Sequence, residues 1–229
     1  MWATTVEQTF RDVVDPHSNF IVLSTPANKL AEWVDKLNFL LYIQQFLAKD
    51  SSIDDVQAFN PLILVFTLAA TTFYAPSDPC GAGRMWSEHI HAVKYWRGGL
   101  PCYDCVFVTK DLSPAPPTNM KDLCVVHLLL LFSFSYCQTI HQCTLIHLLP
   151  FMEDKPDKDT GMRIVESLPN QVPQVVPLNS IYHAAHLIPV YHGISTPSRS
   201  MSMATSLDKF HYYYIDKFIN HHAFEILHE

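Results

Sequence analysis

Cys102 and Cys105 have the spacing of half a zinc site in this 229-residue chain. A CxxC pair supplies two thiolate ligands to a tetrahedral zinc ion and needs two more ligands from elsewhere. Those ligands would come from His141, Cys143 or His147. If residues 103–109 form a strand, however, residues three apart point to opposite faces, so the two thiols would diverge. The spacing therefore favours buried reduced thiols over a zinc site.

Histidines are the second group with chemical potential, since the chain has 13 of them. His89 and His91 would lie on one side of an extended strand, as a pair of metal ligands must. His183 and His186 would lie one helical turn apart, a spacing that suits a metal pair or an acid–base pair. No HExxH-type glutamate accompanies His183 and His186, and no recognised motif supplies second-shell carboxylates to either pair. Core or surface histidines are therefore expected, and no metal or other cofactor.

Two further stretches carry charge or aromatic rings. The acidic stretch 153–159 lacks the mid-loop glycine and the terminal glutamate of an EF-hand, so it is expected to be a solvated turn. The stretch 94–97, Lys-Tyr-Trp-Arg, combines cations with stacking faces, as in binders of single-stranded nucleic acid. Trp96 could instead close the base of a barrel. The sequence contains no glycine-rich phosphate loop, GxSxG elbow or Walker motif.

Composition limits the class of protein. With 48% hydrophobic residues the chain can bury a real core, and a net charge of −7 disfavours non-specific binding of nucleic acid. The apolar runs 61–75 and 123–137 are shorter than the roughly 20 residues that a membrane-spanning helix needs. The N-terminus shows no secretory signal, and reduced cysteines are expected. We therefore expect an intracellular protein of the nucleus or cytoplasm that makes no membrane contact.

The elements that must position these residues begin with a mostly helical segment, 1–78. Leucines and aromatics at helical spacing predict a helix over 25–50, with Thr25 as its N-cap and Pro26 in its first turn. A short helix is expected over 51–59. Residues 61–75 fit a buried strand and a buried helix equally well, because periodicity does not separate the two.

Residues 79–192 are predicted to form a β-rich domain. About five apolar strands separated by tight polar joints indicate an α+β fold built on a small antiparallel β-barrel or curled sheet. One or two helical turns are expected over 179–188. A Ser/Thr-rich linker follows at 193–206, and the last segment, 207–229, is predicted to be one helix with His221 and His222 facing solvent.

Several stretches of this β-rich region also resemble a known family. In order and spacing they resemble the C-terminal region of fungal Plavaka-like proteins, members of the Kyakuja–Dileera–Zisupton DDE transposases, over roughly residues 80–229. The stretches are WRGGLPCYDCVFV, EDKPDKDTGMRIVE, LNSIYHAAHLIPVY and SLDKFHYYYIDKFINHHAFEI. The chain departs from the family at Cys102, where the family tends to have Arg, and at Arg163, where it has Trp.

The resemblance implies a parent enzyme that cuts and joins DNA with an RNase H-like core, in which three carboxylates hold two metal ions. In the family that core precedes the matched region, and no acidic residue of this chain can be assigned to the catalytic triad. The resemblance therefore predicts a non-catalytic accessory or interaction module, or a drifted remnant that retains no activity. The expected partner is another protein or the parent transposase, contacted through Trp96 and through the tyrosines 212–214.

The residues expected to bind a partner or ligand are Trp96, Arg97, Tyr103, Asp104, His147, His183 and His186. Two alternatives remain beside the interaction module. One is a metal-dependent enzyme in which Asp104 and the histidines of that set converge on one cavity. The other is a weak nucleic-acid-binding module, which would show a steep salt dependence of binding.

Overall fold

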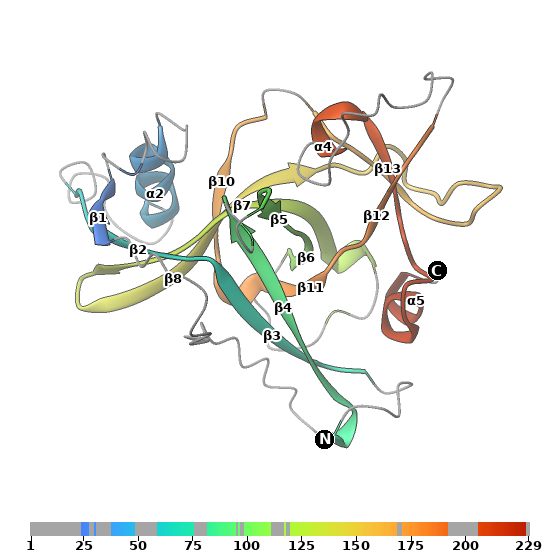
Figure 1. Cartoon of the computed structure of the whole chain (residues 1–229), viewed down its shortest axis with the longest axis horizontal. Helices are drawn as coiled ribbons and strands as arrows, with labels where there is room; N and C mark the ends of the chain where they lie inside the picture. Colours follow the sequence, from blue (N-terminus) through green and yellow to red (C-terminus); the bar gives the residue numbers. More distant parts are fainter. Residues whose placement is uncertain are drawn as a thin grey trace.

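The structure, a computed structural model, describes residues 24–27, 30, 38–48, 59–75, 82–94, 96, 99–110, 117, 120–168, 171–191 and 206–227. This part of the chain is mostly β, with antiparallel strand pairs and a few short helices (Figure 1). Arg97 and nearly all of the expected helix 51–59 and linker 193–206 lie outside the described residues.

The largest sheet is organised around one long hairpin. Its strands are β1 (Ser24–Pro26), β2 (Leu62–Phe66), β6 (Cys105–Thr109), β7 (Leu123–Tyr136), β8 (Thr139–Leu149), β10 (Gln174–Pro177) and β11 (Ile181–Ala184). The hairpin β7–β8 turns at Cys137 and Gln138, which both have positive φ, as a two-residue type I′ turn requires. One edge of β7 pairs with β6 near its start and with β2 near its end, while β8 lies along the other edge and pairs with β10.

The expected barrel is not formed within the described residues. The strand order β1–β2–β7–β6–β11, with β8 and β10 branching from β7, leaves its outer strands unpaired with one another, so the sheet stays open. The sheet is nevertheless curled, because β7 and β8 bend together along their length (Figure 1) and their register shifts between Leu128 and Leu130. The closed barrel is therefore wrong, and the largest sheet is open and curled. The expected number of about five strands is also too low, because this sheet has seven and two further sheets have three each.

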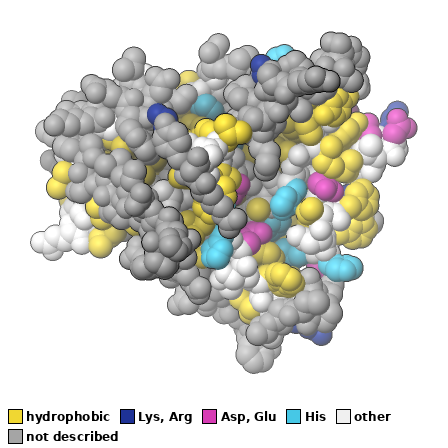
Figure 2. Space-filling model, viewed as in Figure 1, with side chains coloured by type: hydrophobic (Ala, Val, Ile, Leu, Met, Phe, Trp, Pro, Cys, Tyr) yellow, Lys and Arg dark blue, Asp and Glu magenta, His cyan; other side chains and the backbone are white. Residues whose placement is uncertain are grey.

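Two smaller three-stranded sheets accompany the largest sheet. One contains β3 (Leu68–Tyr74), β4 (Met85–Val93) and β5 (Cys102–Tyr103), and the other β12 (Leu187–Pro189), β13 (Tyr212–Ile215) and β9 (Ile164–Glu166). On the face shown in Figure 2, histidine and acidic side chains lie beside one another, close to where β4, β11 and the C-terminal helix lie in Figure 1.

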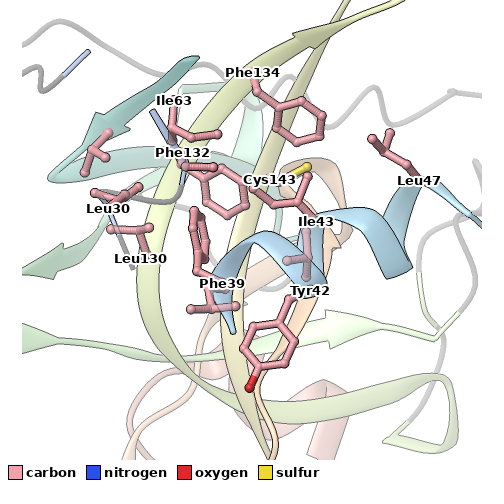
Figure 3. Close-up of a cluster of buried hydrophobic side chains, with 14 residues drawn as sticks. Leu30, Phe39, Tyr42, Ile43, Leu47, Ile63, Leu130, Phe132, Phe134 and Cys143 are labelled. Atoms are coloured by element: carbon pink, nitrogen blue, oxygen red, sulfur yellow. The ribbon is translucent and has the colours of Figure 1, made fainter. Parts of the chain in front are cut away.

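The helices cover the sheets through apolar side chains. The helix α2 (Phe39–Leu47) buries Phe39 and Ile43 against the β7–β8 hairpin, and the Phe39 and Phe132 ring centroids are 5.2 Å apart in an edge-on contact (Figure 3). At the other end, α5 (His221–Leu227) packs Ala223, Ile226 and Leu227 into a second cluster with residues of β11 and β13. Because α2 and β2 come from the first 78 residues, the described parts of 1–78 and 79–192 share one sheet and one core.

The structure decides one open alternative and corrects two expectations about helices. The segment 61–75 forms strands β2 and β3, which decides the alternative that periodicity left open. Ser24–Pro26 pairs with β2 as strand β1, so Thr25 and Pro26 do not begin a helix, although Ala27 and Leu30 are helical. The segment 179–188 is mainly extended, because a single 3₁₀ turn at Leu178–Ser180 leads directly into β11.

The C-terminal segment is not one helix. It forms α4 (Ser206–Lys209), then β13, then α5. The tyrosine-rich run Tyr212–Ile215 has high strand propensity, and it is inserted between β9 and β12 with alternate side chains buried. Tertiary pairing therefore overrides the helical spacing, and the tyrosines do not form a helical contact face.

Candidate functional site

The strand pair β4–β5 brings together a histidine, a cysteine and an aspartate. Val93 pairs with Cys102, and Asp104 follows β5 directly. The Asp104 backbone N–H donates to the His91 carbonyl at 3.0 Å, and the His91 backbone N–H donates to Asp104 Oδ2 at 2.7 Å. Asp104 is therefore fixed against β4 by both its backbone and its side chain.

The three side chains have the separation of metal ligands. His91 Nδ1 lies 3.0 Å from Asp104 Oδ2, and the Cys102 thiol lies 3.7 Å from Asp104 Oδ1. All three ligand atoms lie within 4.8 Å of one another, and within the described ranges no other three His, Cys, Asp or Glu side chains gather this closely. Each is only partly buried, so the group is reachable from solvent.

Trp96 completes this region, which we call the β4–β5 corner: His91, Trp96, Cys102 and Asp104. The indole lies edge-on to the His91 ring, with centroids 4.2 Å apart and an interplanar angle of 67°. Its loop is closed by two backbone hydrogen bonds, from the Trp96 N–H to the Leu100 carbonyl and from the Gly99 N–H to the Trp96 carbonyl. Trp96 is 38% exposed, so it packs at a surface corner and does not close a barrel.

Electrostatics keep the cysteines near the corner protonated. Burial, with Asp104 beside it, raises the pKa of the Cys102 thiol to about 11. Burial raises the pKa of Cys105 to about 12, and this residue packs against the core cluster that contains Phe107. As expected from the strand period, the two cysteines do not share a site, and Cys102 joins His91 and Asp104 instead.

A second group of titratable side chains, the buried histidine cluster, lies where β4, β11 and α5 meet: Glu88, Tyr182, His183 and His222. His183 is 2% exposed, and its ring centroid lies 5.3 Å from that of His222. The Tyr182 hydroxyl is 3.0 Å from His222 Nε2, and His183 Nδ1 is 2.6 Å from the Ala184 carbonyl oxygen. Glu88 Oε1 accepts the Ala184 N–H at 2.5 Å and lies 4.0 Å from His183 Nδ1.

Burial sets the charge state of this cluster. It lowers the pKa of His183 to about 3, with His222 adding to the effect, and lowers the pKa of His222 to about 4. Burial also raises the pKa of Glu88 and raises that of Tyr182 to about 12. Both imidazoles are therefore neutral near pH 7. His183 Nε2 and His222 Nδ1 are buried without a hydrogen-bond partner, which fits rings packed among aromatics.

The remaining candidates lie elsewhere. His147 of β8 pairs with His127 of β7, which in turn pairs with Cys105 of β6. His186 is exposed beyond the end of β11, so His183 and His186 are not one helical turn apart. Tyr103 is half-buried, with its ring 6.2 Å from that of His127. In the described residues, Asp104 and the candidate histidines do not form a group with metal-ligand separation, so the convergence that the enzyme alternative requires is not seen.

No protein-family model, curated protein or solved structure matches the chain. Within the described ranges, no helix has both the length and the hydrophobicity needed to cross a membrane.

Sequence reasoning missed two features. His222 was expected to face solvent, but α5 turns it inward and leaves it 6% exposed, because Ala223, Ile226 and Leu227 anchor the same helix in the core. The ligand set of the β4–β5 corner was also missed, since His91 and Cys102 were each paired with a near neighbour in sequence. The available signal was the alternation of polar and apolar residues over 85–93, followed by a turn and a second extended run. Such a pattern indicates a hairpin, and β4 and β5 do pair with one another.

Proposed function

We propose that this chain is a non-catalytic binding module that contacts another protein through the β4–β5 corner. The observation that carries the proposal is the state of Trp96, which is 38% exposed while its ring is held against His91. Exposed aromatic side chains with a fixed geometry are the usual anchors of protein interfaces, since little rotamer freedom is lost on binding.

The surroundings of Trp96 suit such a contact. Leu100, four residues after Trp96, is 60% exposed, and its carbonyl accepts the Trp96 N–H. Lys94, two residues before Trp96, is also exposed. An apolar centre with a charged neighbour is the common layout of an interface core and its rim. The resemblance to the C-terminal region of Plavaka-like transposases selects the partner, which is the catalytic part of such an enzyme.

The charge states of the titratable groups support a non-catalytic role. A general base works best when its pKa lies near the working pH. Burial instead lowers the pKa values of the buried histidines far below neutrality, to about 4 for His127 and about 3 for His183. They are suited to packing as neutral rings.

The test uses two tryptophans as a matched pair. Trp86 lies near the start of β4, is 37% exposed and pairs with Phe73, whereas Trp96 lies beyond the other end of that strand. The catalytic part of a Plavaka-like transposase, supplied as a separate polypeptide, is titrated with the chain. We expect Trp96→Ala to weaken binding about 30-fold, equivalent to about 2 kcal/mol, and Trp86→Ala to change it less than about twofold.

Three outcomes would contradict the proposal. Absence of binding by the unmodified chain would reject this partner, and equal losses in both variants would reject the β4–β5 corner as the contact face. Turnover of DNA by the chain alone with Mg²⁺ or Mn²⁺ would favour the enzyme alternative.

A further inference from the structure

We propose that His91, Cys102 and Asp104 bind one zinc ion at the β4–β5 corner. This site goes beyond the proposed protein contact and does not depend on it. The ligands are a thiolate, an imidazole and a carboxylate, all of which zinc accepts in proteins.

The separations of the ligand atoms fit a tetrahedral ion. Zinc bonds of about 2.0–2.3 Å at tetrahedral angles place neighbouring ligand atoms about 3.3–3.6 Å apart. Two observed separations lie near this range: 3.0 Å from His91 Nδ1 to Asp104 Oδ2 and 3.7 Å from Cys102 Sγ to the other carboxylate oxygen, Asp104 Oδ1. One ligand atom from each of the three residues lies within 4.8 Å of the other two. Small side-chain rotations would therefore form the site without a change in strand pairing.

The backbone holds the ligands in place before any ion arrives. His91 lies on β4, Cys102 on β5, and two of the three hydrogen bonds between Asp104 and His91 involve the His91 backbone. An ion bound to all three would cross-link the two strands at the base of the loop that carries Trp96. A site built on paired strands loses little freedom when it closes, which favours binding.

The ligand set selects the metal and leaves one position open. Mg²⁺ and Ca²⁺ prefer oxygen ligands, so a site with thiolate and imidazole favours zinc. The side chains of His91 and Asp104 are 18% and 31% exposed, which lets water or a partner's side chain fill the fourth position. On binding, the Cys102 thiol transfers its proton to solvent and its sulfur electron pair forms the bond to zinc.

The experiment titrates the reduced, chelator-treated chain with Zn²⁺ by calorimetry and with Co²⁺ by absorbance. We expect one equivalent of either ion and a thiolate-to-cobalt charge-transfer band. Cys102→Ser should abolish the band and weaken zinc binding more than 100-fold, because losing a ligand exceeds the 10- to 100-fold cost of losing a residue that only orients one. Asp104→Asn should also weaken binding by more than about tenfold.

Cys105→Ser is the matched control, since Cys105 lies three residues away and packs against the core. It should bind zinc as the unmodified chain does, and so should Cys137→Ser at an exposed turn. Circular dichroism confirms that each variant is folded. Equal loss in Cys102→Ser and Cys105→Ser would show a CxxC site and overturn the proposal, as would binding below one equivalent or a Cys102→Ser variant that retains the band. The Trp96 experiment, run in chelator, tests the protein contact separately.

Discussion

The β4–β5 corner and the buried histidine cluster both place a histidine near a carboxylate, yet their environments differ. At the corner, His91 lies 3.0 Å from Asp104, and both side chains reach solvent. In the cluster, His183 lies 4.0 Å from Glu88, whose closer contact is with the Ala184 N–H. Burial makes His183 a neutral core residue, whereas partial exposure leaves His91 available to an ion or a partner. The difference shows that local surroundings, more than residue type, decide which histidines can act.

The largest expected effect is on stability. His183 contacts the rings of Phe73, Phe107 and Tyr182, so His183→Ala would leave a cavity among them. We expect the free energy of unfolding to fall by about 2–4 kcal/mol, measured by urea denaturation. His91→Ala, in chelator, should cost about 1 kcal/mol or less because the His91 side chain is partly exposed. Equal costs would contradict the proposed difference between the two regions.

Zinc bound at the β4–β5 corner should stabilise the folded chain. If the ion binds only the folded chain, free zinc at 100 times its Kd should raise the free energy of unfolding by about 2.7 kcal/mol. The gain should vanish in Cys102→Ser and persist in Cys105→Ser. Thermal unfolding with and without zinc measures it. A gain that survives Cys102→Ser would place the bound ion elsewhere.

Acid should destabilise the buried histidines. The folded pKa values of His127 and His183, about 4 and about 3, lie below the ordinary value of 6.5, so the unfolded chain binds protons first as the pH falls. Stability present above pH 6.5 is therefore lost between that value and pH 3–4, and lowering the pH from 7.5 to 5 should cost about 2 kcal/mol for each histidine. Urea unfolding at both pH values measures the loss, and His183→Phe should remove its own share.

Glu88 should act in the opposite direction. Burial raises the pKa of the Glu88 carboxyl in the folded chain. The folded chain therefore binds a proton at Glu88 more readily than the unfolded chain does, and it gains stability as the pH falls from the folded pKa toward the unfolded pKa. Glu88→Gln should therefore show a steeper loss of stability on acidification than the unmodified chain. A shallower loss would contradict the assigned direction of the Glu88 pKa.

The smallest expected effect concerns Trp96 and stability. Its edge-on contact with His91 contributes about 0.5–1 kcal/mol to folding, so Trp96→Ala should lower the free energy of unfolding by no more than that. The same variant is expected to lose much more in partner binding. A large loss of stability would mean that the indole is a core residue, which would weaken its role as a contact.

Local sequence predicted the strands of the central region and missed others near both ends of the described chain. Apolar runs and turn residues indicated β7, β8, β9 and β10 at nearly their observed positions. The run Tyr212–Ile215 was expected to be helical, because aromatic residues can fit either spacing and only pairing with β9 and β12 selects the strand. About five strands were expected to form a small barrel or a curled sheet, and the branch at β7 leaves the sheet open.

The sequence by itself indicated the extended runs of β7, β8, β9 and β10, and the two-residue period of a strand predicted that Cys102 and Cys105 diverge. Tertiary structure alone decided that His91, Cys102 and Asp104 meet, that His183 and His222 share one buried cluster, and that Trp96 lies over a histidine at the surface. The physical reason is that side-chain direction follows from local backbone geometry, whereas contact between distant residues depends on strand pairing and on the docking of α5, which no local pattern specifies.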